Sequence, residues 1–116
     1  MCGRFTLTAE AEELAKRIKP DYAETHYNLG AALEQTGRVQ EAIEHWEQAL
    51  RIRPDFAEAH YNLGIALVQV GTVQEAIEHY EQALRIKPDM TEARAKLQLA
   101  RQALTKLQEH GASGQR

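Results

Sequence analysis

Residues 57–90 read AEAHYNLGIALVQVGTVQEAIEHYEQALRIKPDM, and they decide the fold because they repeat the stretch before them. Residues 23–56, AETHYNLGAALEQTGRVQEAIEHWEQALRIRPDF, align with them without a gap, and 26 of the 34 positions are identical. Pro20, Pro54 and Pro88 recur at the same interval. A helical pattern with this period is typical of stacked helix-turn-helix units. We therefore predict an all-α solenoid.

Each repeat is predicted to form two antiparallel helices, A and B, joined by a short turn. In the first repeat we expect helix A at residues 23–36 and helix B at residues 39–53. Gly37 and Gly71 fall in the turns, where a residue in the left-handed conformation lets the chain reverse after a helix. Helices joined by so short a turn pack against each other.

Pro-Asp pairs mark the repeat boundaries. Pro cannot continue the preceding helix, and the Asp that follows is a natural N-cap for the next one. The predicted N-caps are Asp21, Asp55 and Asp89. A Glu stands three residues after each, at the capping-box position: Glu24, Glu58 and Glu92.

The apolar positions predict how the helices pack. Trp46 and Tyr80 occupy the same large position of helix B, opposite Gly30 and Gly64 of helix A. Gly inside a helix costs about 1 kcal/mol relative to Ala, so its recurrence predicts a close approach of the two helices. The rest of the predicted core is small or aliphatic: Leu29, Ala32, Leu33, Leu63, Ala66 and Leu67 in the A helices, and Val39, Ala42, Ile43, Ala49, Leu50, Ile52, Val73, Ala76, Ile77, Ala83, Leu84 and Ile86 in the B helices.

The segments outside the two repeats are predicted to be partial units. Residues 13–21 match residues 47–55 at the end of a B helix, so residues 8–20 are expected to form a leading half-repeat helix. Residues 91–109 are expected to form a capping helix with a polar outer side, as a solenoid end needs. Residues 1–7 follow no helical pattern, and residues 110–116 are expected to be a disordered tail. The apolar stripe of the capping helix is Ala93, Leu97, Ala100, Leu104 and Leu107.

The composition narrows the class of protein. A net charge of −3 with interspersed Lys and Arg lacks the basic stripe of a nucleic-acid surface. No apolar run approaches the roughly 20 residues of a membrane helix, and the first residues lack the apolar region of a signal peptide. One Cys excludes an internal disulfide framework. We expect a soluble cytoplasmic protein whose partners include neither membrane nor nucleic acid.

These motifs resemble the tetratricopeptide repeat (TPR) family. Its pattern W-x2-L-G-x2-Y…A-x3-F…P is found as His26-x2-Leu29-Gly30-x2-Leu33…Ala42-x3-Trp46…Pro54, and again from His60 to Pro88, with His and Leu replacing the opening Trp and the Tyr. The repeats are most similar to those in the superhelix of O-linked N-acetylglucosamine transferase, and nothing in the chain resembles that enzyme's glycosyltransferase domain. The resemblance implies a right-handed superhelix whose concave groove, lined by A helices, binds a peptide or partner protein.

The resemblance also implies which residues bind the peptide. Asn28 and Asn62 resemble the asparagine ladder with which transferase-type repeats hold a peptide backbone. A carboxamide suits this task because it both donates and accepts hydrogen bonds. The basic clamp of some TPR co-chaperones is poorly matched, because acidic residues occupy the groove edge and Lys96 is the only well-placed cation. The residues expected to share or border the binding face are Tyr27, Tyr61, Ile65, Val68, Gln35 and Gln69.

The histidines are the candidates for a metal site. His26 and His60 stand on successive A helices, and His45 and His79 on successive B helices. Neighbouring helices pack about 8–10 Å apart, whereas zinc needs three or four ligands at about 2.0–2.3 Å. We therefore predict packing or surface roles and no metal. The repeats contain no nucleophile motif and no phosphate loop, so neither a cofactor nor an enzymatic activity is expected of them.

The first residues, MCGRFTLT, resemble the N-terminus of the SRAP family, whose members crosslink to abasic sites in DNA. In that family the initiator Met is removed and the exposed N-terminal Cys is the nucleophile, a role that the resemblance gives to Cys2. The likeness ends near the start of the chain, and the family's later Asn, Glu and His motifs are missing. We interpret it as a remnant of a gene fusion.

Three functions follow from these observations. The first is a non-enzymatic scaffold that binds a peptide or partner protein in the concave groove. The alternatives are Cys2-dependent crosslinking to abasic DNA, and self-association through the exposed ends of so short a solenoid.

Overall fold

The structure, a computed structural model, describes the backbone of residues 22–114 and the side chains of residues 22–109. A first helix covers residues 22–35. It is followed by α2 (Val39–Ile52), α3 (Ala57–Gln69), α4 (Val73–Ile86) and α5 (Thr91–Gly114). Residues 22–114 contain no strand, and none of their helices is both long enough and apolar enough to cross a membrane. The predictions for residues 1–7 and 8–20 lie outside the described residues.

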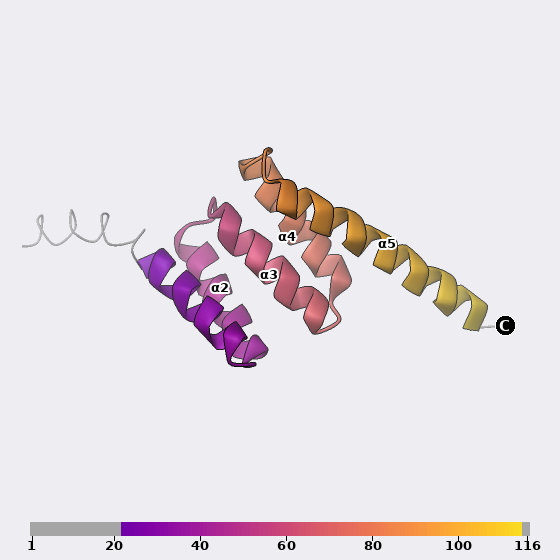
Figure 1. The fold of residues 1–116 in the computed structure, drawn as a ribbon, viewed down its shortest axis with the longest axis horizontal. Coiled ribbons are helices and arrows are strands. Elements are labelled where there is room, and N and C mark those ends of the chain that lie inside the picture. Colours follow the sequence, from indigo (N-terminus) through magenta and orange to yellow (C-terminus); the bar gives the residue numbers. More distant parts are fainter. Residues whose placement is uncertain (1–21, 115–116) are drawn as a thin grey trace, which may run out of the picture.

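The helices form two layers. Figure 1 shows the first helix, α3 and α5 side by side at the front, with α2 and α4 behind them. One buried cluster runs from α2 to α5, so every hairpin packs on its neighbour. The predicted all-α solenoid of helical hairpins is therefore confirmed. The first helix, α3 and α5 occupy the A positions of this array, and α2 and α4 the B positions.

Gly37 and Gly71 reverse the chain inside the two hairpins. Their φ angles are 85° and 90°, which confirms the left-handed conformation. At the first turn, the Arg38 N–H donates to the Leu33 carbonyl at 2.8 Å and so satisfies one of the free carbonyls at the helix end.

The close approach of the A and B helices is also confirmed. Trp46 and Tyr80 are buried, and each ring lies against the glycine of the facing A helix. A methyl group on Gly30 would lie 2.6 Å from Trp46 Nε1, and one on Gly64 would lie 2.6 Å from Tyr80 Cε1. No side chain larger than hydrogen fits at these two positions without displacing the ring.

The predicted Asp caps are wrong in the described part of the chain. The N-cap of α3 is Phe56, with no side-chain hydrogen bond, and α5 begins only at Thr91. Asp55 instead lies inside a turn that is closed by a hydrogen bond of 3.2 Å from the Phe56 N–H to the Arg53 carbonyl. The turn displaces the helix start beyond the Asp.

The two ends of the array also differ from the sequence prediction. Leu29 of the first helix is 46% exposed, whereas Leu63, its counterpart on α3, is fully buried in the cluster that runs from α2 to α5. At the other end α5 continues to Gly114 and does not end near residue 109. Leu107 is 58% exposed, because this part of α5 has already passed the turn where α4 begins (Figure 1).

The face of α5 that would receive a further B helix is polar. Counting one repeat along from α3, Gln98 stands at the position of Gly64, and Arg101 at the position of Leu67. Arg101 Nη2 lies 2.8 Å from Glu81 Oε2 of α4. Gln98 could not admit a closely packed aromatic ring as Gly64 does. This arrangement agrees with the role of a capping helix.

Candidate functional site

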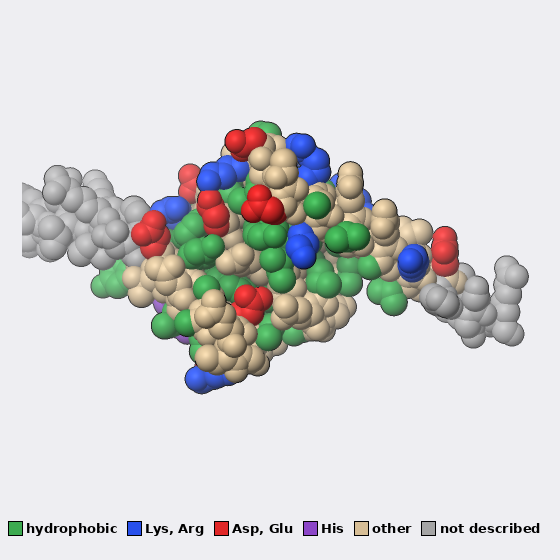
Figure 2. Space-filling model, viewed as in Figure 1, with side chains coloured by type: hydrophobic (Ala, Val, Ile, Leu, Met, Phe, Trp, Pro, Cys, Tyr) green, Lys and Arg blue, Asp and Glu red, His purple; other side chains and the backbone are tan. Residues whose placement is uncertain are grey.

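Hydrophobic side chains gather on the face formed by the first helix, α3 and α5. Figure 2 shows them spread across the middle of this face, over α3 and α5, with charged side chains interspersed and along its rim. The B helices present a different surface, since Glu44 and Glu78 are both exposed there. We refer to the first of these surfaces as the A face.

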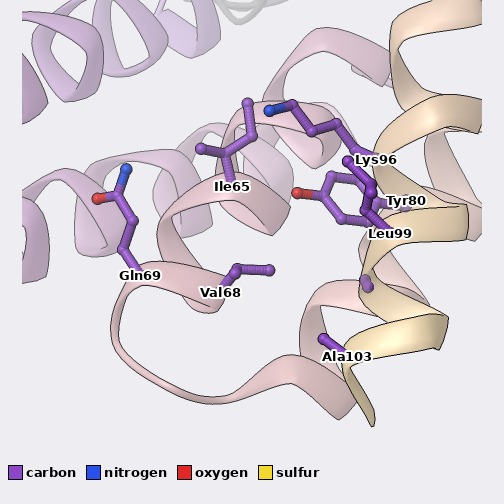
Figure 3. A pocket seen from close by; sticks show the side chains of 8 residues that line it. Ile65, Val68, Gln69, Tyr80, Lys96, Leu99 and Ala103 are labelled. Carbon is purple, nitrogen blue, oxygen red and sulfur yellow. The ribbon is translucent and has the colours of Figure 1, made fainter. Parts of the chain in front are cut away.

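A pocket of about 370 Å³ opens on the A face between α3 and α5. Four of the predicted binding residues line it: Ile65, Val68 and Gln69 from α3, and Lys96 from α5. Figure 3 shows the aliphatic side chains of α3 facing Leu99 and Ala103 of α5, and Lys96 extending from α5 toward Ile65. Sequence reasoning thus brought together residues that do share one concavity.

The sequence prediction missed the other half of this pocket. Tyr80, Leu99, Ala100 and Ala103 complete its lining. Leu99 lies one repeat after Ile65, so the 34-residue register contained the signal that could have identified it. The interpretation of α5 as a cap considered only its buried stripe and overlooked its opposite side.

Tyr27 and Asn62 join the first helix to α3. Burial raises the pKa of the Tyr27 hydroxyl, a hydrogen bond with the Asn62 side chain opposes this shift, and the nearby Glu58 carboxylate raises the pKa further. The Tyr27 ring also packs on Phe56, with the ring centroids 4.9 Å apart. Tyr27 is therefore a half-buried contact between repeats. Asn62 keeps hydrogen-bonding capacity beyond this one bond, because a carboxamide has two donors and an acceptor.

Tyr61 repeats the position of Tyr27 on α3. Burial raises the pKa of its hydroxyl, and the Glu92 carboxylate adds to this shift, as Glu58 does for Tyr27. Its ring lies against Tyr80, with the ring centroids 6.1 Å apart. Like Tyr27, Tyr61 is packed between helices, and only part of its surface borders the A face.

Asn28 and Gln35 lie on the first helix and are exposed. They do not line the pocket between α3 and α5. They stand one repeat before Asn62 and Gln69 and thus extend the same two rows of amides along the A face. The predicted binding residues therefore form a pocket at one end of the surface and a row of amides at the other.

Lys96, which lines the pocket, forms no ion pair with a described residue, whereas other cations near the helix ends and on α5 do. Lys87 Nζ lies 2.5 Å from Glu58 Oε2, and this bond is the main reason why the pKa of the Glu58 carboxyl is lowered. Arg101 is paired with Glu81. Lys96 takes part in none of the three ion pairs among the residues that the structure describes.

The histidines pair within each hairpin. His26 Nδ1 lies 3.0 Å from His45 Nδ1, and His60 Nδ1 lies 3.0 Å from His79 Nδ1. His60 Nε2 lies 2.9 Å from the Pro54 carbonyl, to which it must donate, so its Nδ1 accepts from His79. No group of three or more His, Cys, Asp or Glu side chains within the described part of the chain is placed to hold a metal ion. The pairs join helix A to helix B.

The remaining candidate from the sequence is Cys2. Cys2 and its neighbours are outside the described residues, so the structure does not place the residues that resemble the SRAP N-terminus.

Comparisons with known proteins agree with this architecture. A family model described as "Tetratricopeptide repeat" matches residues 21–89. A search of the curated proteins found no match.

Several solved structures have the same fold. A crystal structure of MamA is 31% identical, with a TM-score of 0.71, over 74% of this chain and 50% of that chain. The chain thus spans half the length of MamA. The second TPR domain of Spaghetti, bound to the HSP90 peptide SRMEEVD, has a TM-score of 0.72 at 22% identity, over 83% of this chain and 89% of that one. The C-terminal TPR-containing domain of a putative FK506-binding protein of Plasmodium falciparum has a TM-score of 0.75 at 24% identity, over 83% and 64% of the two chains.

Proposed function

Because this chain belongs to the tetratricopeptide repeat family, we propose that it is a non-enzymatic scaffold that binds a segment of a partner protein along the A face. The observation that carries this proposal is the pocket between α3 and α5, in continuity with the amide rows of α3 and the first helix. A pocket of about 370 Å³ is near the lower end of the range for ligand sites. It suits a peptide side chain better than a bulky cofactor.

The chemistry of the A face suits an extended peptide. Aliphatic side chains supply apolar contact area, while exposed amides form hydrogen bonds with a peptide backbone whatever its sequence. Asn28 and Asn62 hold the positions that resemble the transferase-type asparagine ladder. The Spaghetti domain holds an HSP90 peptide, which supports peptide binding as a use of this fold.

The test is selection of peptides from a displayed random library against the full chain, followed by affinity measurement on one selected peptide. Replacing Asn28 and Asn62 with Ala should weaken binding by about 0.5–1.5 kcal/mol per lost neutral hydrogen bond. Charge reversal at Glu44 and Glu78, on the opposite side, serves as the control and should change affinity little. Binding that survives the Asn changes and disappears with the Glu changes would reject the A face as the site.

The two alternative functions stay predictions from the sequence. Cys2-dependent crosslinking predicts a covalent adduct with abasic single-stranded DNA that is lost in a Cys2→Ser variant. Self-association predicts a mass in solution above that of one chain. Either result would add an activity to the scaffold or replace it.

A further inference from the structure

The types of side chain on the A face change from the first helix and α3 to α5. Counting by repeats, the positions of Asn28 and Asn62 lead to Lys96. The position of Ile65 leads to Leu99, and that of Gln69 to Ala103. The amides of the earlier units are thus replaced on α5 by one cation and one small apolar side chain, while the position of Ile65 remains apolar. The pocket lies at this transition.

The pocket offers apolar surface that the fold itself does not use. Leu99 is 59% exposed and Val68 is 39% exposed, and the two face each other across the pocket (Figure 3). The ring of Tyr80 also lines the pocket and is itself buried. Covering such surface with an aliphatic side chain removes apolar area from water, which stabilises a complex.

The charge of Lys96 indicates which kind of partner residue would lie beside that aliphatic side chain. Lys96 lines the pocket and has no ion-pair partner among the described residues, whereas Lys87 and Arg101 are paired with Glu58 and Glu81. A carboxylate placed next to the pocket would meet this cation at the edge of an apolar surface.

We propose that the α3–α5 pocket binds an aliphatic side chain within an internal segment of the partner. Lys96 then pairs with an Asp or Glu that directly precedes or follows this aliphatic residue. This inference rests on the proposed peptide-binding function and names the class of peptide. We assign the carboxylate to a side chain and not to a chain end, because Lys96 is the one cation among the residues that line the pocket, whereas the clamp that holds a terminal carboxylate is basic.

The chain supplies matched variants for the test. Lys96→Asn places on α5 the residue that the two earlier units carry, and Leu99→Ala places there the residue of the first unit, Ala31. Both positions are exposed, so neither change should disturb folding, which circular dichroism would verify. Random peptides with amidated C-termini are displayed and selected against the parent chain and each variant, and the enriched sequences are compared.

The parent should enrich peptides with Asp or Glu beside Leu, Ile, Val or Met. Lys96→Asn should remove the acidic preference and weaken a selected acidic peptide about 2–5-fold, an effect that added salt also produces. Leu99→Ala should remove the aliphatic preference and weaken the same peptide about 10-fold. Replacing the acidic residue of the peptide with its amide should match the effect of Lys96→Asn, without adding to it.

Failure of this inference is distinct from failure of the proposed function. Peptides whose binding depends on Asn28 and Asn62, yet is unchanged by Lys96→Asn and Leu99→Ala, would overturn the inference and leave the scaffold function intact. A non-amidated peptide that binds only through its terminal carboxylate would also overturn it. If no peptide is enriched, both the inference and the proposed function are contradicted.

Discussion

At the residue scale, the fold depends on a contact that each hairpin makes between a glycine and an aromatic ring. Trp46 lies on Gly30, and its Nε1–H donates to the Tyr27 carbonyl at 3.0 Å. Tyr80 lies on Gly64 in the same way. A buried indole usually needs a partner for its N–H, and here the facing helix supplies it. The Trp46 side chain therefore stabilises the hairpin through both its packing area and one hydrogen bond.

Truncating Trp46 to Ala should lower the free energy of unfolding by about 3–5 kcal/mol, because the side chain is fully buried. Chemical denaturation of the full chain measures this. Glu44→Ala on the same helix is the control, since its side chain is exposed and should change stability by at most about 0.5 kcal/mol. If the two variants unfold alike, Trp46 does not occupy the core.

The His60–His79 pair makes stability depend on pH. Burial, with a further contribution from His60, lowers the pKa of His79 from 6.5 to about 4, and burial also lowers the pKa of His60. Their Nδ1 atoms share one proton over 3.0 Å, so protonating both would set two N–H groups against each other. Because the unfolded chain takes up these protons first, their contribution to stability is complete above pH 6.5 and is lost as the pH falls toward 4.

A His79→Gln variant tests this effect, since its amide N–H can still donate to His60 but does not titrate in this range. Urea midpoints measured between pH 7 and pH 4 should fall less steeply for the variant than for the parent. His60 still titrates, so a reduced slope is expected and not a flat profile. An unchanged slope would show that the pair does not govern the acid response.

At the element scale, the repeat period predicted most of the fold, because the pattern of each helix occurs twice in the sequence, once in each repeat. The hairpins, the left-handed Gly37 and Gly71, and the Gly–aromatic contacts were all predicted in this way. The capping residues were not: α3 starts after Phe56, because Pro54 and Asp55 are taken up by a turn. A Pro-Asp pair has the same composition whether it caps a helix or forms the turn before it, so sequence alone did not separate the two.

The pocket was only half predicted, for a reason that also lies in the elements. Ile65 and Val68 were identified from α3, but Leu99 of α5 was missed. Its counterpart on the first helix is Ala31, so the growth of apolar surface along the A face is visible only when three units are compared.

The approach of α3 to α4 should tolerate no methyl group at Gly64. Alanine would improve helix propensity by about 1 kcal/mol, yet its Cβ would lie 2.6 Å from the buried Tyr80 ring. We expect Gly64→Ala to destabilise the chain by about 1–3 kcal/mol, as overpacking does. Thermal or chemical unfolding measures this change.

A double variant that combines Gly64→Ala with Tyr80→Leu tests whether the Tyr80 ring causes this loss of stability. If the ring is the obstacle, the double variant should lose less stability than the two single variants added together, with a coupling of about 0.5–3 kcal/mol. Strict additivity would place the cost of Gly64→Ala in the helix itself and not in its contact with Tyr80.

At the scale of the whole molecule, stability and binding are divided between the two layers. The B helices bury their apolar stripes between hairpins, as Ala42, Trp46, Ala76 and Tyr80 show. The A helices supply the other side of that core and keep amides, Val68, Leu99 and Lys96 on their outer face. In the proposed account, the outer face binds the partner while the inner faces hold the array together.

The most direct test of the proposed peptide site is to map the amide chemical shifts of the isotope-labelled full chain while a selected peptide is added. We expect the largest shifts on the A face, around Asn28, Asn62, Ile65 and Leu99, and no change on the exposed side of α2 and α4 near Glu44 and Glu78. Saturable shifts centred on α2 and α4, with the A face unmoved, would contradict it.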